Sequence, residues 1–371
     1  MILKRLILDN YRNYSRLELE LESGLEVVSG DNAQGKTNLL ESVYYLGTLR
    51  SFRTRKEAEL VSWGCSSAGV KALFLRPDGQ ECELEVRWAL NSQGNWERRI
   101  KRNGLVLKNA AEFLRLVPMA LFVPQDLALV QGGPELRRRY LDVLLCKSSP
   151  TYIYDLLRYQ QVLKQRNEWW RQRGFSQRWS ELEVWDEQLA DLAVKLIAER
   201  QGALDELGGL VSAVYSCLAA EPVRLGMSYR STAGTDKARI VQALREKREE
   251  EMRRRYTVIG PHRDDLVVSV QGRDFKHCAS QGQHRSLALA LRLAEAQYLS
   301  EVSANPAVIL LDDCFSELDA GRCRRLFDCL GGMGQVIVTT VNRLEYGGAT
   351  PVTEYAVNRG NIVRLGDVGA I

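Results

Sequence analysis

One glycine-rich octapeptide limits the fold of this chain more than any other feature. Residues 30–37 are Gly-Asp-Asn-Ala-Gln-Gly-Lys-Thr and fit the pattern G-x-x-x-x-G-K-[ST]. A short apolar run, residues 25–29, precedes the octapeptide, and apolar side chains at helical spacing follow it in residues 36–45. The pattern predicts a strand, a phosphate-binding loop and a helix in that order, which is typical of α/β proteins.

The loop carries the side chains that nucleotide chemistry requires. Its backbone N–H groups and the start of the following helix favour an anion. Lys36 is expected to reach the β- and γ-phosphates, and the Thr37 hydroxyl is expected to bind Mg²⁺. A glycine turn that only happens to precede Lys-Thr is the alternative. The residues expected to contact ATP are Gly30, Asp31, Asn32, Ala33, Gln34, Gly35, Lys36, Thr37 and Asn38.

A phosphate-binding loop needs a carboxylate to hold its metal ion. Residues 308–311 are Val-Ile-Leu-Leu, a buried-strand pattern, and Asp312 and Asp313 follow directly. Asp312 is expected to bind Mg²⁺. Asp313, on the other side of the strand end, is expected to orient or deprotonate the attacking water. The alternative is a pair of aspartates that only ends a strand.

A second anion site is expected where another helix begins. Residues 279–283, Ala-Ser-Gln-Gly-Gln, resemble the Leu-Ser-Gly-Gly-Gln signature of ABC-type ATPases. Ser280, Gly282 and Gln283 would then close over the γ-phosphate of an ATP bound by a second subunit. On spacing alone, the same residues could be an ordinary helix N-cap.

Three further positions complete the expected ATPase site. Gln125 follows a strand-like run and is expected to be the Q-loop residue. Residues 316–319, Ser-Glu-Leu-Asp, lie where ABC ATPases carry the D-loop, and Thr340 takes the switch position, which is not histidine here. The expected catalytic residues are Asp313, Gln125 and Lys36.

The remaining sequence divides into three stretches by its pattern. Residues 1–132 show period-two alternation around the loop and predict an antiparallel sheet beside it. Residues 133–255 predict a helical lobe or lever, with candidate helices over 134–147, 150–173, 180–219 with interruptions, and 236–254. Strands and helices alternate again in residues 256–371. We therefore expect an α/β, ABC-type P-loop ATPase domain, a mixed sheet with flanking helices, interrupted by a mostly helical second domain.

Composition limits the surroundings of the protein. Among 371 residues, 45% are hydrophobic and 26% charged, which argues against a disordered chain. No run approaches the about 18 to 20 apolar residues of a membrane span, so we expect a cytoplasmic protein with no membrane partner. The eight cysteines contain no C-x-x-C pair, and reduced, mostly buried thiols are the expectation.

Charge distribution suggests a partner more clearly than net charge does. The formal charge is only +4, but arginines gather in residues 50–56, 98–102, 137–139 and 253–255. The first cluster lies after the expected P-loop helix and includes Phe52. Arginine is a planar donor that suits phosphate, although a solvated surface explains the cluster equally well. If the partner is DNA, as the family resemblance implies, the residues expected to bind it are Arg50, Arg53, Arg55 and Lys56.

Five motifs together resemble the RecF family of bacterial recombination and repair proteins. They are residues 10–14 (Asn-Tyr-Arg-Asn-Tyr), 30–38, 51–54 (Ser-Phe-Arg-Thr), 260–265 (Gly-Pro-His-Arg-Asp-Asp) and 311–319 (Leu-Asp-Asp-Cys-Phe-Ser-Glu-Leu-Asp). The resemblance implies an ABC and SMC-like ATPase that forms a homodimer around ATP. It also implies binding of double-stranded DNA at gaps or single-strand/double-strand junctions, and work with RecO and RecR to load RecA. Weak, DNA-stimulated hydrolysis would release the dimer.

Two other classes of protein stay open from the residues alone. A transporter's nucleotide-binding subunit shares the ATP chemistry but docks on a membrane partner. A P-loop phosphotransferase would transfer phosphate to an acceptor, and residues 280–283 would then be incidental.

Overall fold

The computed structural model describes residues 1–173, 179–219, 222–316, 318–341 and 351–368. Contacts divide the chain into two compact units, each described by itself. Unit 1 comprises Met1–Asp126, Ala213–Val223 and Arg285–Ile371, and unit 2 comprises Leu127–Ser212 and Arg224–His284. The boundaries of these units differ from the domain boundaries expected at 132/133 and 255/256. The expected domain boundaries stay a prediction. No helix in the described ranges is long and apolar enough to cross a membrane.

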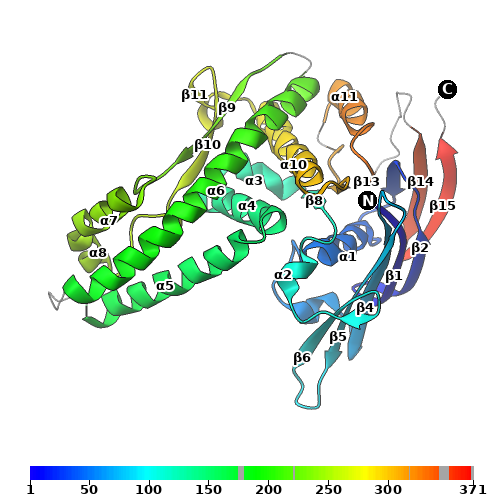
Figure 1. Cartoon of the computed structure of the whole chain (residues 1–371). Coiled ribbons are helices and arrows are strands. Elements are labelled where there is room, and N and C mark those ends of the chain that lie inside the picture. Colours follow the sequence, from blue (N-terminus) through cyan, green and yellow to red (C-terminus); the bar gives the residue numbers. More distant parts are fainter. Residues whose placement is uncertain (174–178, 220–221, 317, 342–350, 369–371) are drawn as a thin grey trace. The chain divides into compact units, whose positions relative to one another are not determined.

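Unit 1 contains two six-stranded sheets (Figure 1). The first sheet is antiparallel, with the order β2-β1-β4-β5-β6-β7. Its strands are β1 (Ile2–Tyr11), β2 (Tyr14–Glu20), β4 (Ser67–Leu75), β5 (Glu81–Leu90), β6 (Trp96–Arg102) and β7 (Leu105–Val106). The antiparallel sheet expected beside the P-loop strand is thus confirmed.

The second sheet has the order β15-β14-β3-β13-β12-β8 and is parallel except for β15. Its strands are β3 (Leu25–Ser29), β8 (Met119–Phe122), β12 (Val308–Asp312), β13 (Val336–Thr340), β14 (Val352–Asn358) and β15 (Asn361–Val368). The central strands β12 and β13 are buried along their whole length, which explains their continuous apolar runs. The sequence patterns did not predict β14 and β15.

The helices of unit 1 complete this core. They are α1 (Lys36–Thr48), α2 (Ala110–Phe113), α11 (Ala320–Leu330) and most of α10 (Gln281–Ser303), with the 3-10 turns η1 (Glu57–Leu60) and η2 (Pro124–Asp126). Helix α1 contacts strands of both sheets, and its Leu40 and Leu46 are fully buried. One continuous hydrophobic cluster therefore joins the P-loop helix to both sheets.

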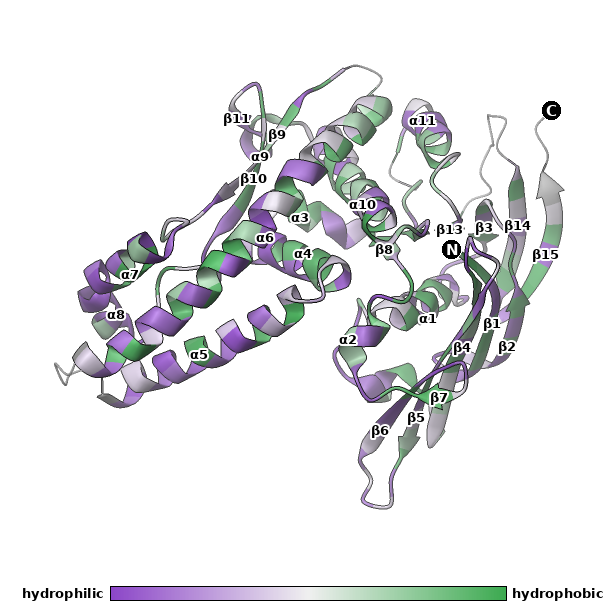
Figure 2. Ribbon diagram, viewed as in Figure 1, coloured by the Kyte–Doolittle hydropathy of each residue, from purple (hydrophilic) through white to green (hydrophobic). Residues whose placement is uncertain are grey.

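Unit 2 is mostly helical, as expected for the insert. Its helices are α3 (Leu127–Gln131), α4 (Pro134–Ser148), α5 (Tyr152–Arg173), most of α6 (Trp179–Ala219), α7 (Lys237–Glu246), α8 (Arg248–Arg254) and α9 (Phe275–Cys278). Helices α5 and α6 lie side by side and antiparallel, joined by the ion pairs Arg166–Asp186 and Lys195–Asp155 (Figure 1). The short helices α7 and α8 are mostly hydrophilic (Figure 2).

Two expectations for the insert were wrong. Helix α6 runs unbroken through all 41 of its residues, although interruptions were expected. A three-stranded sheet, β11 (Arg273–Asp274), β10 (Asp265–Val270) and β9 (Leu225–Arg230), lies in unit 2, and β9 falls in the stretch 133–255 that was expected to be a helical lobe. Strand β9 is only six residues long, and its weak apolar alternation does not predict a strand from sequence alone. Pairing with β10 stabilises it in the fold.

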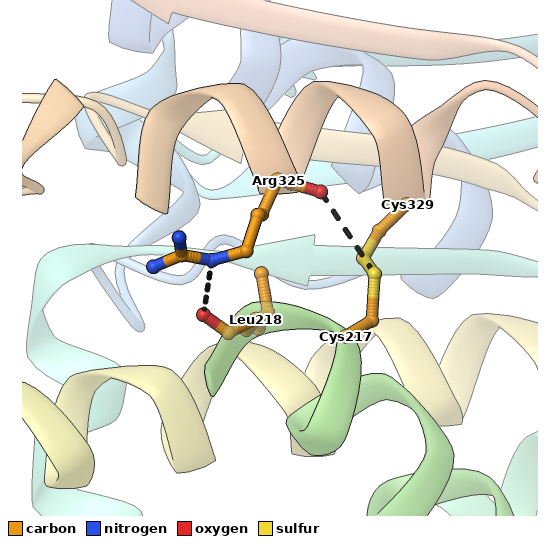
Figure 3. Close-up of a disulfide and its surroundings, with 4 residues drawn as sticks. All are labelled: Cys217, Leu218, Arg325 and Cys329. Atoms are coloured by element: carbon orange, nitrogen blue, oxygen red, sulfur yellow. Dashed lines mark hydrogen bonds between the residues drawn. A yellow bond between two sulfur atoms is a disulfide. The ribbon is translucent and has the colours of Figure 1, made fainter. Parts of the chain in front are cut away.

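The expectation that all cysteines are reduced thiols was also wrong. Cys217, in the last turn of α6, forms a disulfide with Cys329 of α11, both in unit 1 (Figure 3). Beside it, Arg325 Nε donates a hydrogen bond to the Leu218 carbonyl (2.9 Å). The partners are 112 residues apart, so only the tertiary fold brings them together. The other six cysteines form no disulfide.

This disulfide predicts a redox-dependent stability. A cross-link that closes a long loop restricts the unfolded chain, so Cys217→Ser should lower the free energy of unfolding by about 2–4 kcal/mol. Urea titrations with and without reductant measure the difference in the free energy of unfolding. Reductant should lower the value for the wild type to that of the variant. Cys278→Ser, which removes an exposed free thiol, is the control. A wild-type transition that reductant leaves in place would contradict the cross-link.

A buried amide joins the two sheets of unit 1. The Gln335 side chain donates to the Leu3 carbonyl (3.0 Å) and to Glu26 Oε2 (3.0 Å), and it accepts a bond from the Leu3 N–H (2.6 Å). Leu3 belongs to β1 of the first sheet and Glu26 to β3 of the second. Burial raises the pKa of Glu26 to about 8, although hydrogen bonds from Glu22 and Gln335 oppose the shift.

The raised pKa predicts that stability falls as pH rises. The folded protein keeps a proton on Glu26 that the unfolded chain releases above its ordinary pKa of 4.5, so stability is lost between about pH 4.5 and pH 8. The slope should approach ~1.4 kcal/mol per pH unit. In denaturant titrations at pH 5 to 9, Glu26→Gln should remove this slope, whereas the exposed Glu20→Gln should keep it. Equal slopes in the wild type and Glu26→Gln would argue against a neutral Glu26.

Candidate nucleotide site

The loop between β3 and α1 has the backbone that the sequence predicted. A Cβ atom at Gly30 would lie 2.5 Å from the Val357 carbonyl oxygen of β14. Gly35 has a φ of 121°, and a Cβ atom there would lie 2.7 Å from the Asn13 side chain. Both glycines are therefore required, the first by close packing and the second also by its backbone conformation.

Side chains from the first motif of the chain support this loop. Asn13 Nδ2 donates to the Gln34 carbonyl (3.0 Å), and Tyr14 Oη donates to the Gly35 carbonyl (3.0 Å). Asn38 Nδ2, in the first turn of α1, donates to Asn13 Oδ1 (2.8 Å). The turn between β1 and β2 thus holds the loop in place, a role that spacing alone did not reveal.

Lys36 and Thr37 lie at the start of α1 with their polar atoms at the loop. Lys36 Nζ donates to the carbonyls of Gly30 (2.6 Å) and Asp31 (2.8 Å). Burial lowers the pKa of Lys36, while the charges of Asp313 and Asp312 act in the opposite direction. The amine therefore lies within electrostatic reach of both aspartates at the end of β12.

Asp312 is the point where the strands and the loop meet. Its Oδ1 atom accepts hydrogen bonds from Thr37 Oγ1 (3.0 Å) and from Thr339 Oγ1 of β13 (2.6 Å). Burial raises the pKa of Asp312, opposed by these two hydrogen bonds. A hydroxyl and a carboxylate oxygen side by side are donors that suit Mg²⁺, so this pair fits the expected metal.

Asp313 adopts an uncommon backbone conformation beside this pair. Its φ is 47°, in the left-handed region, and its N–H donates to the Thr339 carbonyl (3.1 Å). Its Oδ1 atom is buried and receives no hydrogen bond from the described residues. A strained residue with an unsatisfied carboxylate oxygen is typical of a functional position.

Gln125 follows β8, whose last residues pair in parallel with β12. The carboxyl ends of parallel strands meet at one edge, so Gln125 lies at the same edge of the sheet as Asp312, and it is exposed. The next residue, Asp126, forms a bidentate ion pair with Arg292 of α10 (2.6 and 3.1 Å). Sequence reasoning missed this buried pair, since no local pattern joins residues 166 positions apart.

The signature-like residues form the start of α10, in unit 2. Ser280 Oγ accepts a bond from the Gln283 N–H (3.3 Å), and Gln283 Oε1 accepts one from the Ser280 N–H (2.8 Å). This is a reciprocal capping box, so the N-cap alternative describes the structure. Ser280 and Gln283 are exposed and Gly282 is half-buried. A nucleotide role for these residues stays a prediction.

Exposed basic side chains occupy the segment after α1, as expected. They are Arg50, Arg53, Arg55 and Lys56. Ser51 Oγ of the same segment donates to the buried Glu41 of α1 (2.5 Å), which also accepts two bonds from Arg12 (both 2.7 Å). Arg53 Nη1 donates to Asn38 Oδ1 (2.5 Å), so this residue touches the P-loop helix itself.

The expected D-loop lies between β12 and α11. Asp319 is the N-cap of α11 and accepts a bond from the Arg322 N–H (2.9 Å), while Ser316 donates to the Asp313 carbonyl (3.0 Å). Glu317 lies outside the described residues. Thr340 is buried at the end of β13.

The Asp126–Arg292 ion pair predicts a large loss in the free energy of unfolding when one partner is removed. Replacing Arg292 by Leu leaves a buried Asp126 carboxylate without its cation and should cost about 3–5 kcal/mol. Denaturant unfolding of Arg292→Leu, Asp126→Leu and the double variant measures the coupling. The double variant should recover part of the loss. Additive losses would show that the two side chains do not stabilise each other.

Comparison with known proteins agrees with this geometry. The sequence matches the RecF/RecN/SMC N-terminal domain family over residues 2–361. A DNA replication and repair protein RecF from Lachnoclostridium phytofermentans is 33% identical over 93% of this chain and 94% of its own length. A solved structure of the recombination mediator protein RecF with ATP, in the RecFOR pathway, has a TM-score of 0.86 at 31% identity and covers 98% of this chain and 97% of its own.

An SMC head bound to the winged-helix domain of ScpA shares the fold at 14% identity and a TM-score of 0.59, covering 99% of this chain and 98% of its own. The expected ABC-type α/β fold, a mixed sheet with flanking helices and a long helical insertion, is thus confirmed. The chain belongs to the RecF/RecN/SMC N-terminal domain family and, within it, to the RecF DNA replication and repair proteins.

Proposed function

We propose that this protein is an ATP-dependent DNA-binding protein of recombinational repair and replication-fork maintenance. The observation that carries the proposal is the contact between Thr37 and Asp312 (3.0 Å) beside the Lys36 amine. This contact supports the proposal, because ATP chemistry requires a phosphate-binding loop beside a carboxylate that could hold Mg²⁺. The relatives named DNA replication and repair proteins, and the relative solved with ATP, support the same function.

The described residues suit weak ATP hydrolysis. Thr37 and Asp312 would hold Mg²⁺, which neutralises charge on the β- and γ-phosphates when bound. Lys36 would leave the loop carbonyls for the phosphates, and Asp313 with Gln125 would orient water at the carboxyl edge of the sheet. DNA-stimulated hydrolysis would then act as a conformational switch and not as a source of rapid turnover.

Dimerisation follows from the second expected anion site. Ser280, Gly282 and Gln283 lie at the start of a long helix, where the backbone favours an anion. In the ABC arrangement they would contact the γ-phosphate of an ATP held by a second copy of the chain. ATP would therefore hold a homodimer together, and hydrolysis would release it.

DNA contact is proposed for Arg50, Arg53, Arg55 and Lys56. Arg53 bonds to Asn38 of the P-loop helix, so a change at the nucleotide would reach this segment through a direct contact. The proposed substrate is double-stranded DNA at gaps or single-strand/double-strand junctions. The RecFOR pathway of the solved relative supports RecO and RecR as partners and assistance in RecA loading. The family match favours this function over a transporter subunit or a phosphotransferase.

The proposal predicts ATP-dependent DNA binding. In fluorescence anisotropy with labelled gapped and blunt duplexes, Mg-ATP should tighten binding relative to Mg-ADP or no nucleotide. Lys36→Met should abolish this gain and weaken ATP-dependent binding about tenfold or more, the equivalent of one charge-assisted hydrogen bond. Ser280→Arg should abolish it too, because a bulky cation fills the anion site.

Gln172→Arg is the matched control, since it adds the same charge at an exposed position of α5. Particle mass from sedimentation should double with ATP only in the wild type and the control. Equal DNA affinity in all nucleotide states would show that nucleotide does not control DNA binding and would reject the proposal.

A further inference from the structure

The motif Gly260–Asp265 lies in unit 2, outside the contacts described for the candidate nucleotide site, and five of its six residues are engaged inside the protein. The Gly260 N–H donates to Thr232 Oγ1 (2.8 Å), and a Cβ atom at Gly260 would lie 2.7 Å from Tyr159 Oη. The Pro261 carbonyl accepts a bond from the buried Arg200 (2.7 Å). These contacts fix the first turn of the motif.

The histidine and the two aspartates of the motif also form contacts inside the protein. His262 lies between Tyr159 Oη (2.7 Å) and the Thr257 carbonyl (3.1 Å), and burial lowers its pKa to about 4. Asp264 is fully buried and accepts bonds from Tyr229 and Thr232. Asp265 forms a bidentate ion pair with Arg137 (2.8 and 2.9 Å). All of these side chains act within the fold.

Arg263 is the exception. Its side chain is exposed, and its guanidinium lies 5.0 Å from the centroid of the Tyr256 ring. No carboxylate among the described residues forms an ion pair with it. The motif therefore holds one arginine outward on a rigid, internally bonded turn, which limits the entropy lost when that arginine binds a ligand.

Two further arginines contact Tyr256 and the residue that follows Arg263. Arg254 of α8 donates to Tyr256 Oη (3.4 Å), and Arg138 of α4 donates to the Asp264 carbonyl (2.7 Å). Arg254 lowers the pKa of Tyr256 by its hydrogen bond and its charge, and Arg263 adds to the shift. We define Arg138, Arg254, Tyr256 and Arg263 as the arginine cradle.

Acidic neighbours leave this cluster basic. Glu250 pairs with Arg254 (3.1 Å) and with Lys247 (3.0 Å), and Asp265 is paired with Arg137. Burial and the positive charges of Arg200 and Arg263 lower the pKa of Arg138. The negative charges of Asp265 and Glu135 act in the opposite direction and do not cancel this shift. Arg138 bonds to the carbonyl of the residue that follows Arg263, and guanidinium groups gathered in this way fit an anionic ligand.

We propose that the arginine cradle binds the phosphate backbone of duplex DNA. Guanidinium groups match phosphate oxygens with paired N–H donors, and the tyrosine hydroxyl is a further phosphate ligand. The site belongs to unit 2, whereas residues 50–56 belong to unit 1. It rests on the proposed function and adds a second DNA contact, made by the insert. Because only phosphates are contacted, binding is independent of base sequence and falls with salt.

The salt dependence of DNA binding tests this site. Each lost phosphate contact reduces the slope of log affinity against log salt by about 0.9, so Arg263→Gln should weaken binding about eightfold at 0.1 M salt. Arg138→Gln/Arg263→Gln should lower the slope by about 1.8. Arg245→Gln, at an exposed arginine of α7, should leave it unchanged. Binding of a fluorescent ATP analogue should be the same in all these variants.

Two further arms separate the outcomes. Arg263→Lys keeps the charge and should retain most of the slope, which guards against a folding defect in Arg263→Gln. Inorganic phosphate, exchanged for chloride at constant ionic strength, should compete only weakly with DNA for the wild type. A wild type that binds inorganic phosphate through Arg263 while its DNA affinity does not depend on Arg263 would assign the cradle to a free anion and overturn the DNA role.

The outcomes also separate this inference from the proposed function. If the wild type binds DNA with ATP but Arg263→Gln keeps the full slope, the inference fails and the proposed function stands. A wild type that does not bind DNA at all overturns both.

Discussion

The candidate nucleotide site depends on the hydrogen bonds that the Asp312 carboxylate accepts. Strand β13 lies between β3 and β12, so the P-loop and the aspartate start from strands that are not neighbours. The parallel register places Thr339 beside Asp312, and its hydroxyl bonds to the carboxylate, while Thr37 reaches the same oxygen from α1. A buried carboxylate without such partners lowers the stability of the fold by more than an ordinary hydrogen bond adds to it. The strand register of β12 and β13 and the position of α1 are therefore constrained together with the geometry of the site.

A second set of bonds extends from this centre to the surface. Buried Glu41 holds Arg12 on one side and Ser51 on the other, so it ties α1 both to the first sheet and to the basic segment. The bond from Arg53 to Asn38 adds a link at the first turn of α1. The proposed nucleotide contacts and the proposed DNA contacts in unit 1 therefore belong to one hydrogen-bonded assembly.

Unit 2 uses buried charge differently. Arg166 and Arg200 are almost fully enclosed, and each is matched by carboxylates or hydroxyls from several elements. Such pairs tolerate little rearrangement, because removing one partner leaves an uncompensated charge. The Gly260–Asp265 motif is built on this rigid network, which explains why a short polar segment can hold Arg263 in a defined place.

The sequence by itself determined the strand–loop–helix unit, the pairing of a P-loop with Asp312, the helical insert and the alternation of strands and helices after it. These features depend on local periodicity and on motifs whose residues lie close together in the chain. Only the tertiary structure decided the Cys217–Cys329 cross-link, the Asp126–Arg292 pair, strand β9 and the internal role of most of Gly260–Asp265. Their partners are far apart in sequence, and long-range pairing leaves no local pattern.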